Sequence, residues 1–193
     1  MPEIRIKNNI LEVVNEIKIL GITIQSDMKW TSNTRNMILK ANKRLWILRR
    51  LKNLGALAGD LLEVYTKQIR CILEYAAPAW QSSITQEEKT NIERVQKSAF
   101  HIILGNSYQS YENALQLLGM ETLNLRRKRL TYKFALRSEK NDKFKFWFKP
   151  AKKTLNTRTT INKYCDVKAN HKRFMNSPIP YLTRLLNWHH NKQ

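Results

Sequence analysis

From about residue 31 the apolar residues recur with the period of an α-helix, and the first helix of this kind carries positive charge without any acid. Its apolar face consists of Ile38, Ala41, Leu45, Leu48 and Leu51. This spacing predicts a helix that ends near residues 53–55. No Asp or Glu occurs between Asp27 and Asp60. The same interval contains Lys29, Arg35, Lys40, Lys43, Arg44, Arg49, Arg50 and Lys52.

Uncompensated positive charge on a helix with one buried face predicts a negatively charged partner. Solvated helix faces ordinarily mix the two signs of charge. A phosphate backbone is the usual polyanion that such a surface meets. This interpretation requires Lys43, Arg44 and Arg50 to be exposed along one side of the helix, and it fails if they are scattered around it or covered by neighbouring segments.

The charge of the whole chain is also positive, and it is unevenly distributed. The 193 residues include 35 Lys or Arg and 15 Asp or Glu, which gives a net charge of +20. Residues 126–193 hold 19 of the basic residues and only three acids. Because like charges repel, such a segment is predicted to be a solvated basic arm.

Further along the chain, the helical period continues and breaks at recognisable signals. A second helix is predicted after Gly59 and closes before Pro78. A third begins with Thr85 as its N-cap and ends at Gly105. A short helix is predicted at residues 110–118 and a fifth at residues 123–137.

The first 25 residues have the β-branched, alternating composition of two or three short strands. The predicted fold is therefore mainly α, with an N-terminal β-hairpin (residues 1–30), a helical bundle (31–140) and a basic, partly disordered tail (141–193) that includes a short helix at residues 181–187. Such a hairpin is marginal alone and needs a sheet or helix to pack on.

Several classes of protein are disfavoured by composition. No apolar run approaches the roughly 18 residues of a membrane span, and no apolar signal core stands near the N-terminus. Two cysteines are too few for a disulfide framework, so an intracellular location, nuclear or cytoplasmic, is expected. Cys165, His171, His189 and His190 do not match zinc-ligand spacing. No hydrolase or Gly-rich phosphate-loop motif occurs.

Three stretches and the tail together resemble a known family. They are residues 19–30 (ILGITIQSDMKW), 72–80 (ILEYAAPAW), 92–99 (IERVQKSA) and 173–187 (RFMNSPIPYLTRLLN). In this order they resemble the C-terminal part of reverse transcriptases of non-LTR (LINE-type, jockey-like) retrotransposons. There, a strand with the pattern YLGxxxD…W follows the polymerase palm, and a helical thumb carries PILxYxxPxW and IExVQxxA.

This resemblance implies a fragment of an RNA-directed DNA polymerase that comprises the primer grip, thumb and tail. Family members hold catalytic Mg²⁺ on palm carboxylates that include an Ala-Asp-Asp turn, and this chain has no Asp-Asp pair. The fragment is thus expected to lack the palm, to need no cofactor of its own and to be inactive alone. Its implied partners are template–primer nucleic acid and a palm or fingers segment.

The candidate nucleic-acid-binding residues lie in three places. The first is the predicted primer grip, at Leu20 and Gly21, where a glycine in a strand suits close backbone approach. The second is the basic helix, with Arg35, Lys40, Lys43, Arg44 and Arg50 as phosphate contacts. The third is the basic block at Arg126, Arg127 and Arg129. Trp46 is expected to pack between helices rather than to stack on a base. Tyr75, Pro78 and Trp80 are expected to close the end of the bundle core.

Two alternatives fit the same charge pattern. One is a stand-alone, non-enzymatic RNA- or DNA-binding protein. The other is a cationic helical protein that binds a membrane surface or a partner protein. Binding to phosphates should weaken steeply as the salt concentration rises, and this distinguishes the nucleic-acid interpretations from binding to a membrane surface or a partner protein.

Overall fold

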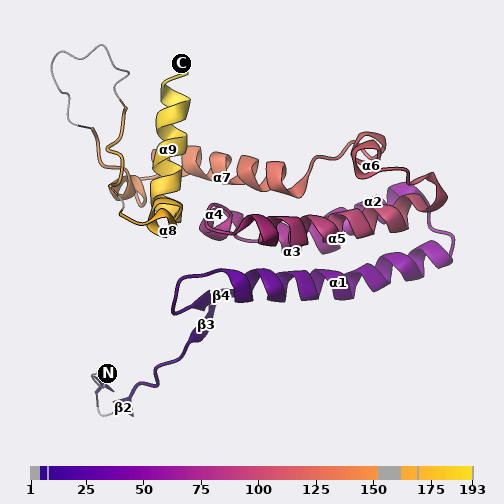
Figure 1. Ribbon diagram of the computed structural model, residues 1–193, viewed down its shortest axis with the longest axis horizontal. Helices are drawn as coiled ribbons and strands as arrows, with labels where there is room; N and C mark the ends of the chain where they lie inside the picture. Colours follow the sequence, from indigo (N-terminus) through magenta and orange to yellow (C-terminus); the bar gives the residue numbers. More distant parts are fainter. Residues whose placement is uncertain (1–4, 8, 152–161, 169, 193) are drawn as a thin grey trace.

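A computed structural model describes residues 5–7, 9–151, 162–168 and 170–192. It confirms a mainly helical fold with N-terminal β-hairpins. Figure 1 shows the helices in layers, with α1 (Thr31–Asn53) on one side and α7 (Leu123–Lys140) on the other. Between them lies a middle layer that contains α5 (Gln86–Leu104). The first strands project from one end of this stack (Figure 1).

Two antiparallel strand pairs precede the helices. The first joins β1 (Arg5–Ile6) to β2 (Asn9–Ile10), and the second joins β3 (Glu16–Ile19) to β4 (Ile22–Gln25). In the second pair a two-residue turn at Leu20 and Gly21 has positive φ at both positions, 48° and 86°. Positive φ at both central residues is the backbone of a type I′ hairpin turn.

The hairpin packs on α1, which supplies the support that two strands need in water. The side chains of β3 are exposed, whereas β4 is partly buried. The backbone N–H of Thr23 donates to Asn33 Oδ1 over 3.1 Å, and Asn36 Nδ2 donates to Thr23 Oγ1 over 3.3 Å. The hairpin therefore has a fixed position against the first turns of α1.

The predicted apolar face of α1 is confirmed, because Ala41, Leu45 and Leu48 are buried against α5 and the segment 58–74. The third predicted helix, α5, is also confirmed at both ends. Thr85 forms a capping box with Glu88, and Gly105 with a φ of 54° ends the helix. The core of this part of the molecule is a single cluster of buried apolar side chains from α1 to α7.

The second predicted helix is divided in the structure. It comprises α2 (Ala58–Val64), a π-helical turn η1 (Tyr65–Arg70) and α3 (Cys71–Glu74). The chain then turns at Ala76, which has a φ of 49°, and starts the short helix α4 (Ala77–Trp80). Pro78 thus lies in the first turn of a new helix, where its missing N–H costs nothing. Trp80 is fully buried, as expected for the end of the core.

The predicted short and fifth helices are present as α6 (Tyr111–Leu117) and α7, which extends three residues beyond its predicted end. The tail forms α8 (Lys172–Met175) and α9 (Pro178–His190). The helix predicted at residues 181–187 is thus confirmed within a longer one. Residues 152–161, which belong to the predicted tail, lie outside the described residues.

The basic tail carries a second apolar cluster that the sequence analysis did not predict. It consists of Ala135, Phe148, Tyr164, Leu182 and Leu186. Figure 1 shows α9 crossing the C-terminal end of α7. Tail and α7 also meet at Glu139, whose Oε1 accepts hydrogen bonds from Lys163 Nζ (2.8 Å), the Tyr164 hydroxyl (2.5 Å) and His190 Nε2 (2.7 Å). Part of the predicted solvated arm is therefore a packed segment.

Candidate nucleic-acid interface

A groove of about 870 Å³ lies between the β3–β4 hairpin, α1 and α3. Its basic lining residues are Lys18, Lys40, Lys43 and Arg44, and no Asp or Glu lines it. The hairpin contributes Gly21, Ile22 and Thr23, and α3 contributes Cys71 and Ile72. The fold thus joins a glycine turn and a set of cations that are about twenty residues apart in the sequence.

The hairpin turn stands at the edge of this groove and is held there by Tyr75. The Tyr75 hydroxyl donates a 2.8 Å hydrogen bond to the backbone oxygen of Leu20. A Cβ atom placed on Gly21 would lie 3.4 Å from Tyr75 Cε1, in ordinary van der Waals contact, but the positive φ of Gly21 favours glycine at this position. Leu20 itself is 85% exposed. Tyr75 is therefore a groove residue, although the sequence suggested only a role at the end of the bundle core.

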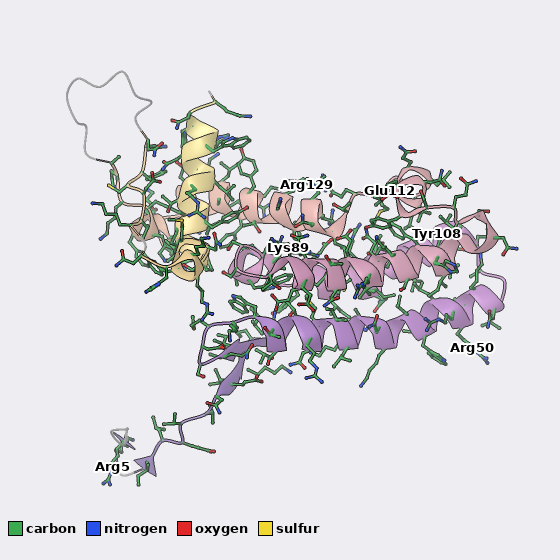
Figure 2. The ribbon with its side chains drawn as sticks, in the orientation of Figure 1. Arg5, Arg50, Lys89, Tyr108, Glu112 and Arg129 are labelled. Carbon is green, nitrogen blue, oxygen red and sulfur yellow. The ribbon has the colours of Figure 1, made fainter. Side chains whose placement is uncertain are left out.

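The cations of α1 are exposed, but they do not all lie along one side of the helix, which the sequence interpretation also requires. Lys40, Lys43, Arg44 and Arg50 all have exposed side chains. Lys43 and Arg50 are seven residues apart and share one face of the helix. Figure 2 shows Arg50 projecting from the outer side of α1, away from the other helices. Arg44 lies farther around, where its Nη1 donates to the backbone oxygen and to Oε1 of Gln68 in η1 over 2.8 and 3.0 Å.

Arg35 and Lys52 differ from these four cations. Arg35 is exposed but lines a separate hollow of about 590 Å³ between α1 and α5, which also includes Glu87 and Glu88. Lys52 is half-buried and donates its Nζ to the Ile103 backbone oxygen over 3.0 Å. Lys40, Lys43 and Arg44 therefore line the groove, Lys43 and Arg50 share the outer face of α1, and Arg35 belongs to neither surface.

The basic block on α7 makes contacts within the protein, and the burial of Arg127 corrects the sequence interpretation for that residue. Arg127 is fully buried, and its Nε donates to Gln81 Oε1 over 2.6 Å. Burial lowers the pKa of Arg127 to about 10. Arg126 forms an ion pair with Glu74, and Arg129 with Glu121. Figure 2 shows Arg129 on α7, across the bundle from α1. Arg127 is not available to a nucleic acid, whereas Arg126 and Arg129 share two acids with Arg70, and Arg129 remains half-exposed.

Trp46 also differs from expectation, because its side chain is 64% exposed rather than packed between helices. Its position on the outer face of α1 follows from the helical period, since Lys43 precedes it by three residues and Arg50 follows it by four. The outer face thus combines cations with a large aromatic ring. The spacing of Trp46 from Lys43 and Arg50 was visible in the sequence and could have identified this arrangement.

Comparison with models of protein families, with curated proteins and with solved structures finds no match to this chain. Within the described ranges, no helix is long and apolar enough to cross a membrane. In the same ranges, no three His, Cys, Asp or Glu side chains are grouped so that they could hold a metal ion. The groove and the exposed cations of α1 are therefore the features that define the candidate interface.

Proposed function

We propose that this chain binds nucleic acid through the groove and the outer face of α1, as a primer-grip and thumb segment of a LINE-type reverse transcriptase would. The observation that supports this most is the groove itself, which Lys18, Lys40, Lys43 and Arg44 line together with Gly21 of the hairpin turn and without any acid. These are the elements that the resemblance assigns to a primer grip and an adjacent thumb helix.

The chemistry of the groove suits a sugar-phosphate backbone. Lys and Arg side chains neutralise phosphates and release counterions, which gives affinity without sequence preference. The exposed turn at Leu20 and Gly21 presents its backbone at the edge of the groove, with the Tyr75 ring packed against Gly21 and the Leu20 side chain exposed. Template–primer duplex is the ligand that this combination favours.

No step of DNA synthesis is assigned to these residues. Two-metal phosphoryl transfer requires clustered carboxylates, and neither an Asp-Asp pair in the sequence nor a group of metal ligands among the described residues supplies them. In this proposal, Mg²⁺ and the catalytic carboxylates belong to a palm segment. A stand-alone RNA- or DNA-binding protein would use the groove in the same way, and restored primer extension on addition of a palm fragment distinguishes the two.

The alternative of a membrane-surface protein is favoured by one observation. Leu39, Leu54 and Leu57 are exposed on or just beyond α1, close to the cations. A basic helix with exposed leucines can lie on anionic lipid. We favour nucleic acid because the four cations line a groove of defined shape beside a hydrogen-bonded turn, although the apolar side chains of Ile22, Met37, Leu39 and Ile72 line it as well.

Charge reversal on α1 tests the proposal. We expect Lys43→Glu plus Arg50→Glu to weaken binding of a fluorescein-labelled RNA–DNA duplex by at least about tenfold at 0.1 M salt, because two phosphate contacts become repulsive. Fluorescence anisotropy measures the affinity, and unrelated duplex sequences should lose it equally.

The matched control reverses the same two residue types on α7, at the exposed Lys133 and Arg137. This control changes the net charge by the same amount but leaves the groove intact. Equal loss of affinity in the two variants would mean that net charge alone, rather than α1, attracts the duplex. Tight binding to neutral vesicles that no salt concentration weakens would favour the membrane alternative.

A further inference from the structure

Trp46 is surrounded on the surface of α1 by polar and cationic side chains. Residues three and four positions away are neighbours on a helix. For Trp46 these are Asn42, Lys43, Arg49 and Arg50, all of which are exposed. Three of the four carry positive charge, and no acid occurs anywhere in α1. An indole ring therefore stands exposed inside a ring of cations.

The indole ring of Trp46 is also free of the contacts that cover an exposed tryptophan elsewhere in this chain. Trp188 on α9 is 52% exposed, but Tyr132 meets its ring edge-on at 6.1 Å and Lys192 Nζ lies 4.3 Å from its centroid. No ring or cation pair of this kind involves Trp46 in the ranges that the structure describes. The ring of Trp46 is therefore an aromatic surface that a ligand could cover, and its burial would be favourable.

We propose that Trp46 stacks on an unpaired base, and that the outer face of α1 holds a single-stranded segment of nucleic acid. Lys43, Arg49 and Arg50 then contact the phosphates on either side of the stacked base. This inference rests on the proposed function and extends it, since it names the kind of nucleic acid that the outer face takes and adds Arg49 and Trp46 to the interface.

Stacking requires a single strand for a geometric reason. In a duplex both faces of each base are covered by the neighbouring base pairs, so an indole ring can reach only base edges or the backbone. In a single strand the bases can be splayed out and stacked on aromatic side chains, while a positively charged surface follows the phosphates. An unpaired strand that adjoins the duplex would then lie over Trp46, while Lys43 and Arg50, which flank this residue, contact the phosphates of either ligand.

The test compares two ligands of equal length, a labelled 12-nucleotide oligouridylate and a blunt 12-base-pair RNA duplex, at one salt concentration. We expect Trp46→Ala to weaken binding of the single strand by about 5- to 150-fold, the range for loss of one stacked base. Binding of the duplex should change by less than about twofold. Trp46→Phe keeps an aromatic ring and should retain most of the single-strand affinity.

Leu54→Ala is the matched control, because Leu54 is an exposed apolar residue at the end of the same helix. It should leave both affinities unchanged. Circular dichroism of each variant verifies that the helices are intact, and Trp46→Phe provides a folded comparison if the alanine variant is not.

Three outcomes would overturn the inference. The first is an unchanged single-strand affinity in Trp46→Ala, and the second is an equal loss on both ligands. The third is a loss of binding to phosphatidylglycerol vesicles with RNA binding intact, which would assign the exposed ring to a lipid surface. If Lys43→Glu plus Arg50→Glu still weakens duplex binding in any of these cases, the proposed function stands and only the stacking inference fails. If the wild-type protein binds neither ligand, the proposed function fails as well.

Discussion

At the scale of single residues, the role of each cation is decided by what packs around it. Arg127 stands in a basic block, yet Leu123, Arg127 and Thr131 are all buried, four residues apart on the inner face of α7. This spacing was present in the sequence and could have identified Arg127 as an inward-facing residue. The ion pairs of Arg126 and Arg129 join residues up to 52 positions apart, and no local pattern predicts them.

The buried position of Arg127 leads to a prediction about stability. We expect Arg127→Ala to lower the free energy of unfolding by about 2–5 kcal/mol, because it leaves a cavity beside Trp80 and removes the partner of Gln81. Arg129→Ala, which removes a half-exposed ion pair, should cost no more than about 1 kcal/mol. Urea unfolding followed by circular dichroism measures both. Equal stability of the two variants would contradict the structural role of Arg127.

At the scale of elements, helices with strong periods and caps were predicted well, and those that depend on distant contacts were not. Thr85 and Gly105 delimited α5 because capping chemistry is local. The π-helical turn at Tyr65–Arg70 has no such local signal, whereas Pro78 indicated the break that the chain makes at Ala76. α9 was only partly predicted, because its apolar residues pack on α7 and the sequence pattern does not show which surface they cover.

Glu139 joins α7 to the tail, and its ionisation gives a prediction about pH. Burial alone would raise its pKa, but hydrogen bonds from Lys163, Tyr164 and His190 hold the pKa of this carboxyl down at about 2. A carboxylate with a lowered pKa stabilises the folded state above its ordinary pKa of about 4.5, and this contribution is lost as the pH falls toward 2.

We therefore expect Glu139→Gln to be less stable than the wild type at pH 6, with a difference that shrinks as the pH falls from about 4.5 to 2. Urea unfolding at a series of pH values measures this difference. Asp142, which is exposed and pairs with Lys145 nearby in the chain, provides the control substitution Asp142→Asn. A difference that does not depend on pH would contradict the role of the Glu139 carboxylate.

At the scale of the whole molecule, the sequence predicted the fold class and the basic helix, but not the groove. The groove exists because the hairpin packs on α1 through Thr23 and Asn33, and because Tyr75 holds the turn at its edge. These are polar contacts between residues that are 10 and 55 positions apart in the sequence, and neither hydrophobic period nor charge pattern reveals them. Because of these contacts, the cations of α1 line a groove with a defined shape.

The central claim is that the cations of α1 contact phosphates, and the salt dependence of binding tests it most directly. Affinity for a duplex falls as the salt concentration rises, and each phosphate contact makes the slope of log affinity against log salt more negative by about 0.9. We predict that Lys43→Gln and Arg50→Gln each make the slope for an RNA–DNA duplex shallower by about one, and that the double variant makes it shallower by about two. An unchanged slope in the double variant would contradict the account.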